Sequence, residues 1–286
     1  MPSLAYTLSM PARLTTSVVF ASPHSGRVYP PSFMRATVLD ERSIRTSEDA
    51  FVDQLLDGVP GLGAPLLAAV APRAFIDLNR ASDELDPALI EGVRISSHNP
   101  RVSSGLGVIP RVVSGGRAIY RGKMPLAEAE ARIADWWTPY HRCLQDLVDQ
   151  ARARFGEAVL IDMHSMPHEA IEQVSGHSAR RPEIVIGDRY GAAAGAAVVD
   201  RIEAAFEGAG LRVIRNAPFA GAYITQSYGR PSRRQHAVQI EVDRALYMNE
   251  RDIRPNGNFN GFKRLLTGIL SEIVDVGRSE MPLAEE

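Results

Sequence analysis

The sequence lacks three features that would mark it for a specialised environment or partner. Its single cysteine, Cys143, cannot form a disulfide within the chain, and we expect it to be a small buried residue of a helix. Its 32 lysine and arginine residues nearly balance 34 acidic residues, which leaves a net charge of −2 and no long run of one sign. The basic surface of a nucleic-acid-binding protein is therefore not expected, and we predict no nucleic-acid partner.

Long apolar segments are lacking as well. No stretch approaches the roughly 20 apolar residues that span a membrane, and the N-terminal segment shows no basic region followed by an apolar run. We therefore expect no membrane partner and a cytoplasmic location. No internal repeat and no low-complexity linker divides the chain, so residues 1–286 are predicted to form a single domain, for which 45% hydrophobic residues provide a core.

Short apolar runs alternate with stretches of helical periodicity, which is the pattern of an α/β protein. Because most runs are apolar on both faces, we predict a central, mixed and mostly parallel sheet that helices flank on both faces. The glycine-containing segment 103–117 lacks the spacing of a phosphate loop and is predicted to be a flexible surface or lid loop. The predicted strands are 17–21, 64–70, 158–163, 183–187, 211–215 and 236–242, and the clearest helices are 125–155, 191–208 and 258–276.

Polar side chains gather where the predicted strands end. In open α/β sheets, ligands bind beyond the carboxyl ends of the strands, so these residues are candidates for a functional site. Two histidines, several carboxylates and arginines at neighbouring strand ends would form a complete set for hydrolysis. The candidates are His24 after the first run, Arg73, Asn79 and Arg80 after the second, Asp162 and His164 in the third, and Glu241 in the last.

The two histidines are candidates for metal ligands. A catalytic zinc typically has three protein ligands and one water, so a carboxylate is expected beside His24 and His164. Glu48 or Asp49 would supply it at the start of a helix for which Ser47 is the predicted N-cap. Acids in a first helical turn also stabilise the helix dipole without any metal, and no HExxH motif is present, so the spacing leaves both interpretations open.

The third strand adds a local argument for His164. Asp162 lies two residues before it, so both side chains project to the same face, and the carboxylate is placed to orient the imidazole. Asp77 and Arg80, near a predicted turn, are also consistent with a purely structural ion pair. A serine nucleophile is disfavoured because the sequence lacks the G-x-S-x-G turn.

Several short segments together resemble one known family, that of the N-formylglutamate amidohydrolases. The resemblance covers about residues 17–250, and the family is similar to the zinc carboxypeptidases and aspartoacylases, which have an eight-stranded mixed sheet between helices. The segments occur in the family's order and are SPHSGRVYP, SEDAFVDQL, RAFIDLNR, IDMHSMP, GDRYG, YITQSYGRP and HAVQIEVDRALYM.

The resemblance implies a metal-dependent hydrolase of a small N-acyl amino acid, with Zn²⁺ or another divalent metal. The family's type reaction releases formate and glutamate from N-formylglutamate during histidine degradation. The implied roles are metal ligation by His24, Asp49 and His164, with Glu48 as the alternative carboxylate, proton transfer by Glu241, oxyanion stabilisation by Arg73 and substrate binding by Asn79 and Arg80.

One departure from the family pattern affects the expected substrate. The chain has AGAYITQSYG at 220–229 where the family reads close to KGGYITRHYG, so Gln226 replaces an arginine. We predict that Gln226 and Arg230 contact the substrate, with Arg230, Arg233 or Arg111 replacing the lost charge. Another N-acyl amino acid, a small peptide, or a ligand-binding protein without catalysis are the alternatives. The sequence does not set an oligomeric state.

Overall fold

The structure is a computed structural model that describes residues 5–94, 99–175 and 181–278. Its centre is a sheet in the order β1-β3-β2-β4-β7-β5-β6, and a separate pair, β8 and β9, lies outside it. The strands are β1 Tyr6–Ser9, β2 Val18–Ser22, β3 Leu66–Ala69, β4 Ala158–Met166, β5 Ile184–Gly187, β6 Val213–Arg215, β7 Gln235–Asp243, β8 Met248–Asn249 and β9 Arg254–Pro255.

The four central strands, β3, β2, β4 and β7, run parallel to one another. Strand β1 is antiparallel to β3, while β5 is antiparallel to β7 and parallel to β6. The predicted α/β class with a mixed, mostly parallel sheet is thus confirmed. Over the described ranges the main sheet has seven strands, against the eight expected from the related zinc enzymes.

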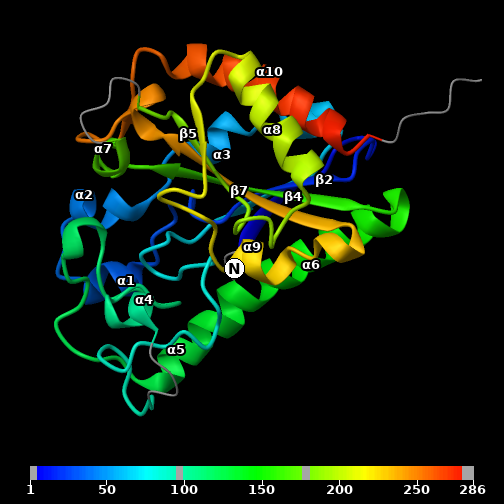
Figure 1. Ribbon diagram of the computed structural model, residues 1–286. Helices are drawn as coiled ribbons and strands as arrows, with labels where there is room; N and C mark the ends of the chain where they lie inside the picture. Colours follow the sequence, from blue (N-terminus) through cyan, green and yellow to red (C-terminus); the bar gives the residue numbers. More distant parts are fainter. Residues whose placement is uncertain (1–4, 95–98, 176–180, 279–286) are drawn as a thin grey trace, which may run out of the picture.

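Helices cover both faces of the sheet, as Figure 1 shows. The helices α3 (Val52–Leu55), α8 (Ala196–Gly208) and α10 (Phe259–Val276) pack on one face, and α5 (Leu126–Arg132), α6 (Thr138–Phe155) and α9 (Tyr223–Tyr228) on the other. Successive strand residues point to opposite faces, so Val18 and Phe20 belong to one core and Val19 and Ala21 to the other. The remaining helices are α1 Pro31–Ala36, α2 Glu41–Ile44, α4 Pro100–Ser103 and α7 His168–Ser175.

The predicted helix 125–155 is interrupted close to its proline. A π-helical turn, Ile133–Trp137, separates α5 from α6, and Pro139 lies in the first turn of α6, where its missing N–H costs least. Cys143 on α6 is only half-buried, which corrects the expectation of a fully buried residue. None of the helices in the described ranges is long and apolar enough to cross a membrane.

Candidate active site

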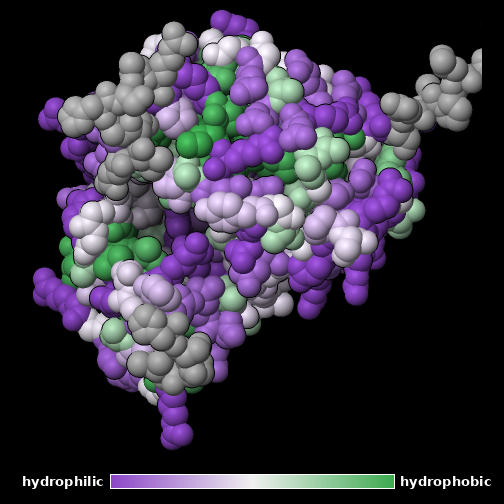
Figure 2. All heavy atoms as spheres, viewed as in Figure 1, coloured by the Kyte–Doolittle hydropathy of each residue, from purple (hydrophilic) through white to green (hydrophobic). Residues whose placement is uncertain are grey.

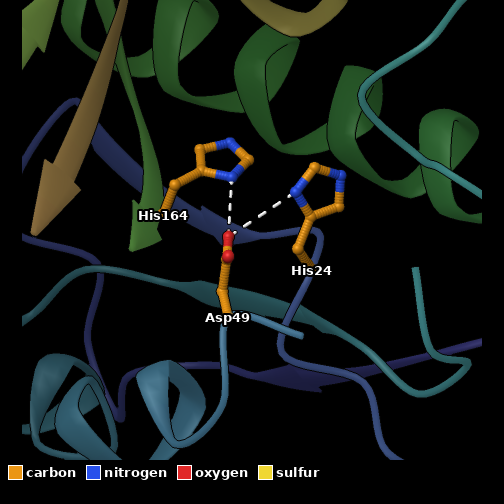
Figure 3. A group of neighbouring side chains, drawn as sticks. All are labelled: His24, Asp49 and His164. Atoms are coloured by element: carbon orange, nitrogen blue, oxygen red, sulfur yellow. Dashed lines mark hydrogen bonds and ion pairs between the residues drawn. The ribbon is translucent and has the colours of Figure 1, made fainter. Parts of the chain in front are cut away.

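Three side chains from distant parts of the chain converge beyond the central strands. His24 follows β2, His164 lies within β4, and Asp49 comes from the segment before α3. Asp49 Oδ2 is 3.0 Å from His164 Nδ1 and 3.5 Å from His24 Nδ1 (Figure 3). All three are almost fully buried, and one ligand atom from each lies within 4.8 Å of the others. The predicted ligand set is therefore brought together.

The choice between Glu48 and Asp49, which the sequence left open, depends on the backbone before α3. Asp49 N donates to the carbonyl of His24 over 3.0 Å, which holds its side chain beside the imidazoles. Glu48 points elsewhere and accepts hydrogen bonds from Tyr29 Oη at 2.6 Å and Arg45 Nε at 3.0 Å. Asp49 is thus the carboxylate that faces both histidines.

The predicted role of Ser47 as a helix N-cap is wrong. Ser47 ends a 3-10 turn, Arg45–Ser47, and α3 begins only at Val52. The Ser47 hydroxyl instead accepts a hydrogen bond from the backbone N–H of Ser114. Glu48 is extended, so Asp49 precedes the helix rather than standing in its first turn. The helix-dipole explanation for this acid therefore does not apply.

Each imidazole has a second carboxylate at its other nitrogen. His164 Nε2 lies 3.0 Å from Asp162 Oδ2, as the two-residue spacing predicted, and His24 Nε2 lies 2.7 Å from Asp77 Oδ1. If both Nε2 atoms donate to these carboxylates, both Nδ1 atoms present lone pairs toward Asp49. Across the described residues, His24 Nδ1 is a buried polar atom without a hydrogen-bond partner.

These residues fit a divalent cation. Burial lowers the pKa of His164, but the carboxylates of Asp162 and Asp49 outweigh burial and raise that pKa well above its ordinary value. The surroundings thus favour positive charge at this point, which a metal ion can supply in place of a proton. Two imidazole nitrogens and one carboxylate oxygen are the donors of a typical catalytic zinc site with one position open.

Glu241 stands next to this group on the neighbouring strand. It is the register partner of His164 between β4 and β7, and its side chain accepts a hydrogen bond of 2.9 Å from Gln239 Nε2. Burial raises the pKa of Glu241 to about 7, with the charge of Asp49 adding to the effect and that of His164 opposing it. A carboxyl group with a pKa near neutrality can both accept and return a proton.

Arg73 lines the same cavity and lies four residues before Asp77. Its Nε donates to Asp77 Oδ2 over 2.9 Å, so one carboxylate binds both Arg73 and His24. The two terminal nitrogens of Arg73 have no acceptor within the described ranges. This geometry fixes the guanidinium while leaving N–H groups available to a ligand. The structural ion pair predicted for Asp77 is therefore made with Arg73, whereas Arg80 has other partners.

Asn79 and Arg80 both line the cavity, but they differ in what they leave free. The Asn79 amide is engaged by the protein: Oδ1 accepts from Ile224 N at 2.8 Å, and Nδ2 lies 3.2 Å from Asp162 Oδ2. Arg80 donates from Nε to the carbonyl of Leu106 and from Nη1 to that of Asn79, which leaves Nη2 uncommitted. Asn79 is therefore better placed to hold the site together than to contact a ligand.

The predicted metal ligands, Glu241 and the polar residues that follow β3 line one cavity of about 740 Å³. They are His24, Asp49, His164, Glu241, Arg73, Asn79 and Arg80. Figure 2 shows the surface hollowed at the left of the view, between the parts of the chain that carry α7 and α4 in Figure 1. Segment 103–117, predicted to be a flexible loop, supplies part of the wall, and its fully buried Val108 and Ile109 anchor it to the core.

Gln226 and Arg230, for which the sequence predicts a contact with the substrate, do not line this cavity. Both are exposed, and they lie in a separate shallow pocket of about 420 Å³. The reason is local: α9 turns Thr225 and Ile224 inward, so Gln226 faces outward. Arg111, another predicted replacement, is paired with Asp86 at 2.8 Å.

The sequence-based reasoning missed two residues that contact the triad or its neighbours. Asp77 orients His24 although 53 residues separate them. Arg244 donates to Asp49 Oδ1 over 3.0 Å and to Ser165 Oγ over 3.2 Å. Arg244 directly follows β7, so a polar residue at the end of the strand that carries Glu241 was the available signal.

Fold and site together define an α/β protein with a buried histidine–aspartate–histidine group at the carboxyl ends of its parallel strands. The family model described as N-formylglutamate amidohydrolase matches residues 16–248. The chain belongs to the N-formylglutamate amidohydrolase family.

Known relatives agree with this assignment. An N-formylglutamate deformylase of Pseudomonas aeruginosa is 33% identical over 237 residues, which are 82% of each chain. One of Pseudomonas putida is 30% identical over 236 residues, again 82% of each. The crystal structure of an N-formylglutamate amidohydrolase from Ralstonia eutropha superposes with a TM-score of 0.89 at 36% identity, covering 96% of this chain and 98% of that one.

Proposed function

We propose that this chain is a metal-dependent amidohydrolase that removes the formyl group from an acidic N-formyl amino acid, with N-formyl-L-glutamate as the first candidate substrate. The observation that carries the proposal is the buried His24–Asp49–His164 group, with Glu241 beside it, in a chain of this family. The names of its relatives support the substrate. Zn²⁺ is the proposed cation, and Co²⁺ or Mn²⁺ could use the same ligands.

A divalent cation held by the triad would polarise the formyl carbonyl and lower the pKa of a water molecule. Glu241 would take the proton from this water and deliver it to the leaving nitrogen. Its place opposite His164 in the sheet supports this role, because the carboxylate is raised on a rigid strand beside the metal ligands. Its pKa of about 7 suits both halves of the transfer.

Two arginines complete the proposed chemistry. The free N–H groups of Arg73 would stabilise the oxyanion that develops on the formyl oxygen. Arg80 would bind a substrate carboxylate through its remaining donors, and Asn79 would hold the loop and the Asp162–His164 pair in place. In the net reaction the bond between the formyl carbon and nitrogen breaks, the water oxygen joins the carbon, and formate and a free amino acid leave.

We further propose that the enzyme is cytoplasmic, that its substrate is a small molecule and that it acts in histidine degradation. The direct test is formate release from N-formyl-L-glutamate beside N-formyl-L-aspartate and N-acetyl-L-glutamate, each scored by kcat/KM. The purified protein should contain close to one divalent ion per chain. Removal of that ion by a chelator should abolish formate release, and added Zn²⁺ should restore it.

The alternatives predict different outcomes of the same panel. A hydrolase of another N-acyl amino acid would prefer a different member, and a protein without catalysis would bind metal but release no acid from any compound. Full activity in a His164→Ala variant, together with protein that contains no divalent ion, would contradict the proposed mechanism itself.

A further inference from the structure

Four arginines line the cavity of the candidate active site, and three of them already have partners. Arg73 and Arg244 are each paired with a buried aspartate. Arg80 donates to two backbone carbonyls. The fourth, Arg101 on α4, is exposed, and across the described residues its side chain makes neither a hydrogen bond nor an ion pair. It is therefore a positive charge at the cavity wall whose donors are free to bind a ligand.

The backbone at Arg101 is held firmly although its side chain is free. Its N–H donates to the side chain of Asn99 over 3.0 Å, and its carbonyl accepts from Leu106 N over 2.8 Å. The carbonyl of Leu106 in turn accepts from Arg80 Nε over 2.9 Å. Leu106 thus connects the backbone of Arg101 to the buried guanidinium of Arg80, and the fold fixes the position of the Arg101 backbone relative to that group.

Arg73, Arg80 and Arg101 all line the cavity. Burial lowers the pKa of Arg80; the charges of Asp77 and Glu84 oppose this effect, and the positive charges of Arg73 and Arg101 add to it. Like charges that converge on one cavity favour an anionic ligand, which relieves their repulsion. A ligand with two carboxylates would suit Arg80 and Arg101 better than a ligand with one.

We propose that Arg101 binds the side-chain carboxylate of the acidic N-formyl amino acid and thereby sets the preference for acidic over neutral substrates. This inference rests on the proposed function. Arg80, adjacent in chain to Asn79 and buried beside the triad, suits the α-carboxylate near the scissile amide. Arg101, exposed on the cavity wall, suits the more distant carboxylate. The structure thus assigns to α4 the charge that Gln226 and Arg230, outside the cavity, cannot provide.

The test compares two substrates of the same shape, N-formyl-L-glutamate and uncharged N-formyl-L-glutamine, by kcat/KM. In the Arg101→Gln variant the preference for the glutamate compound should fall by about 10- to 100-fold, the range expected for a hydrogen-bonded ion pair. Hydrolysis of the glutamine compound should be unchanged. Arg101→Lys should keep part of the preference. Arg264→Gln, the same change at an exposed position on α10, is the matched control and should behave as wild type.

Two outcomes would overturn the inference. Equal losses on both substrates would assign Arg101 to the α-carboxylate or to folding, and no loss on either would show that it binds neither. Calorimetric Kd values of both compounds, measured on metal-loaded wild type and Arg101→Gln protein, test the same point without turnover. If the wild type hydrolyses neither compound, the proposed function fails, while the Kd comparison still decides the role of Arg101.

Discussion

The two histidines of the candidate metal site receive their second carboxylates in different ways. His164 and Asp162 lie two residues apart on β4, so the alternation of a strand is enough to place them together. His24 depends on Asp77, which lies 53 residues away on the loop after β3 and also binds Arg73. One half of the site, with Asp162, His164 and Glu241, is therefore built into the sheet, and we call it the strand half. The other half, with His24, Asp77 and Arg73, is assembled from loops, and we call it the loop half.

The largest loss of activity is expected when the proton acceptor of the strand half, Glu241, is removed. Glu241→Gln keeps the size of the side chain and its place opposite His164, but it removes the proton acceptor. We expect kcat for formate release to fall by about 10²- to 10⁴-fold, the usual contribution of a general base. Bound metal, measured by elemental analysis, should remain. A variant that lost its metal in parallel would show that Glu241 acts in binding the ion instead.

The comparison between the halves is sharpened by two matched variants, Asp162→Asn and Asp77→Asn. Each removes a carboxylate behind one histidine. Each should lower the affinity for the metal ion by about 10- to 100-fold, as measured by competition with a chelator. Asp77→Asn should also lower kcat at saturating metal, because Arg73 loses the partner of its Nε. Asp162→Asn at saturating metal should recover most of its kcat. Identical behaviour of the two variants would contradict the division into halves.

The pH dependence of the reaction should reflect the strand half. Glu241 must be deprotonated to accept a proton, and burial raises its pKa to about 7. The value of kcat/KM should therefore rise with pH and then level off, decreasing about tenfold per unit below the pKa. Because a bound cation favours the carboxylate, this acid limb should lie at or below pH 7. Residual activity of Glu241→Gln should lack the limb.

The smallest effect is expected where the π-helical turn before α6 anchors the loop half. Trp137 Nε1 donates to the carbonyl of Arg80 over 2.9 Å, so Trp137→Phe leaves that acceptor without this donor. We expect the free energy of unfolding in urea to fall by about 1 kcal/mol. Trp136→Phe is the matched control, since Trp136 packs against Phe75 through its ring. Equal losses in both variants would show that ring size, and not the hydrogen bond, stabilises the loop.

The strand half was predictable because its evidence is local. The apolar run before Asp162 and His164 predicts a buried strand, and the period of two places both side chains on one face. The same alternation along β7 places the side chain of Glu241 on one face of that strand. In the structure, β4 extends beyond the predicted end, through His164 to Met166, and His164 and Glu241 are in register.

The loop half could not be predicted from spacing, because loops carry no periodicity that fixes where a side chain points. The pairing of Asp77 with His24 and the contact of Arg244 with Asp49 both join residues that are far apart in the chain. The place of Arg101 on the cavity wall likewise depends on the tertiary structure. Gln226 shows the converse, since the family pattern predicts a substrate contact for a residue that α9 places outside the cavity.

The sequence by itself determined the α/β class, the buried strands and the two histidines, because hydrophobic periodicity and the polar ends of strands are local properties of the chain. Only the tertiary structure decided that Asp49 and not Glu48 faces those histidines. Both acids are adjacent in the chain and chemically alike. A single backbone hydrogen bond from Asp49 to His24 turns one into the site, while Tyr29 and Arg45 hold the other away.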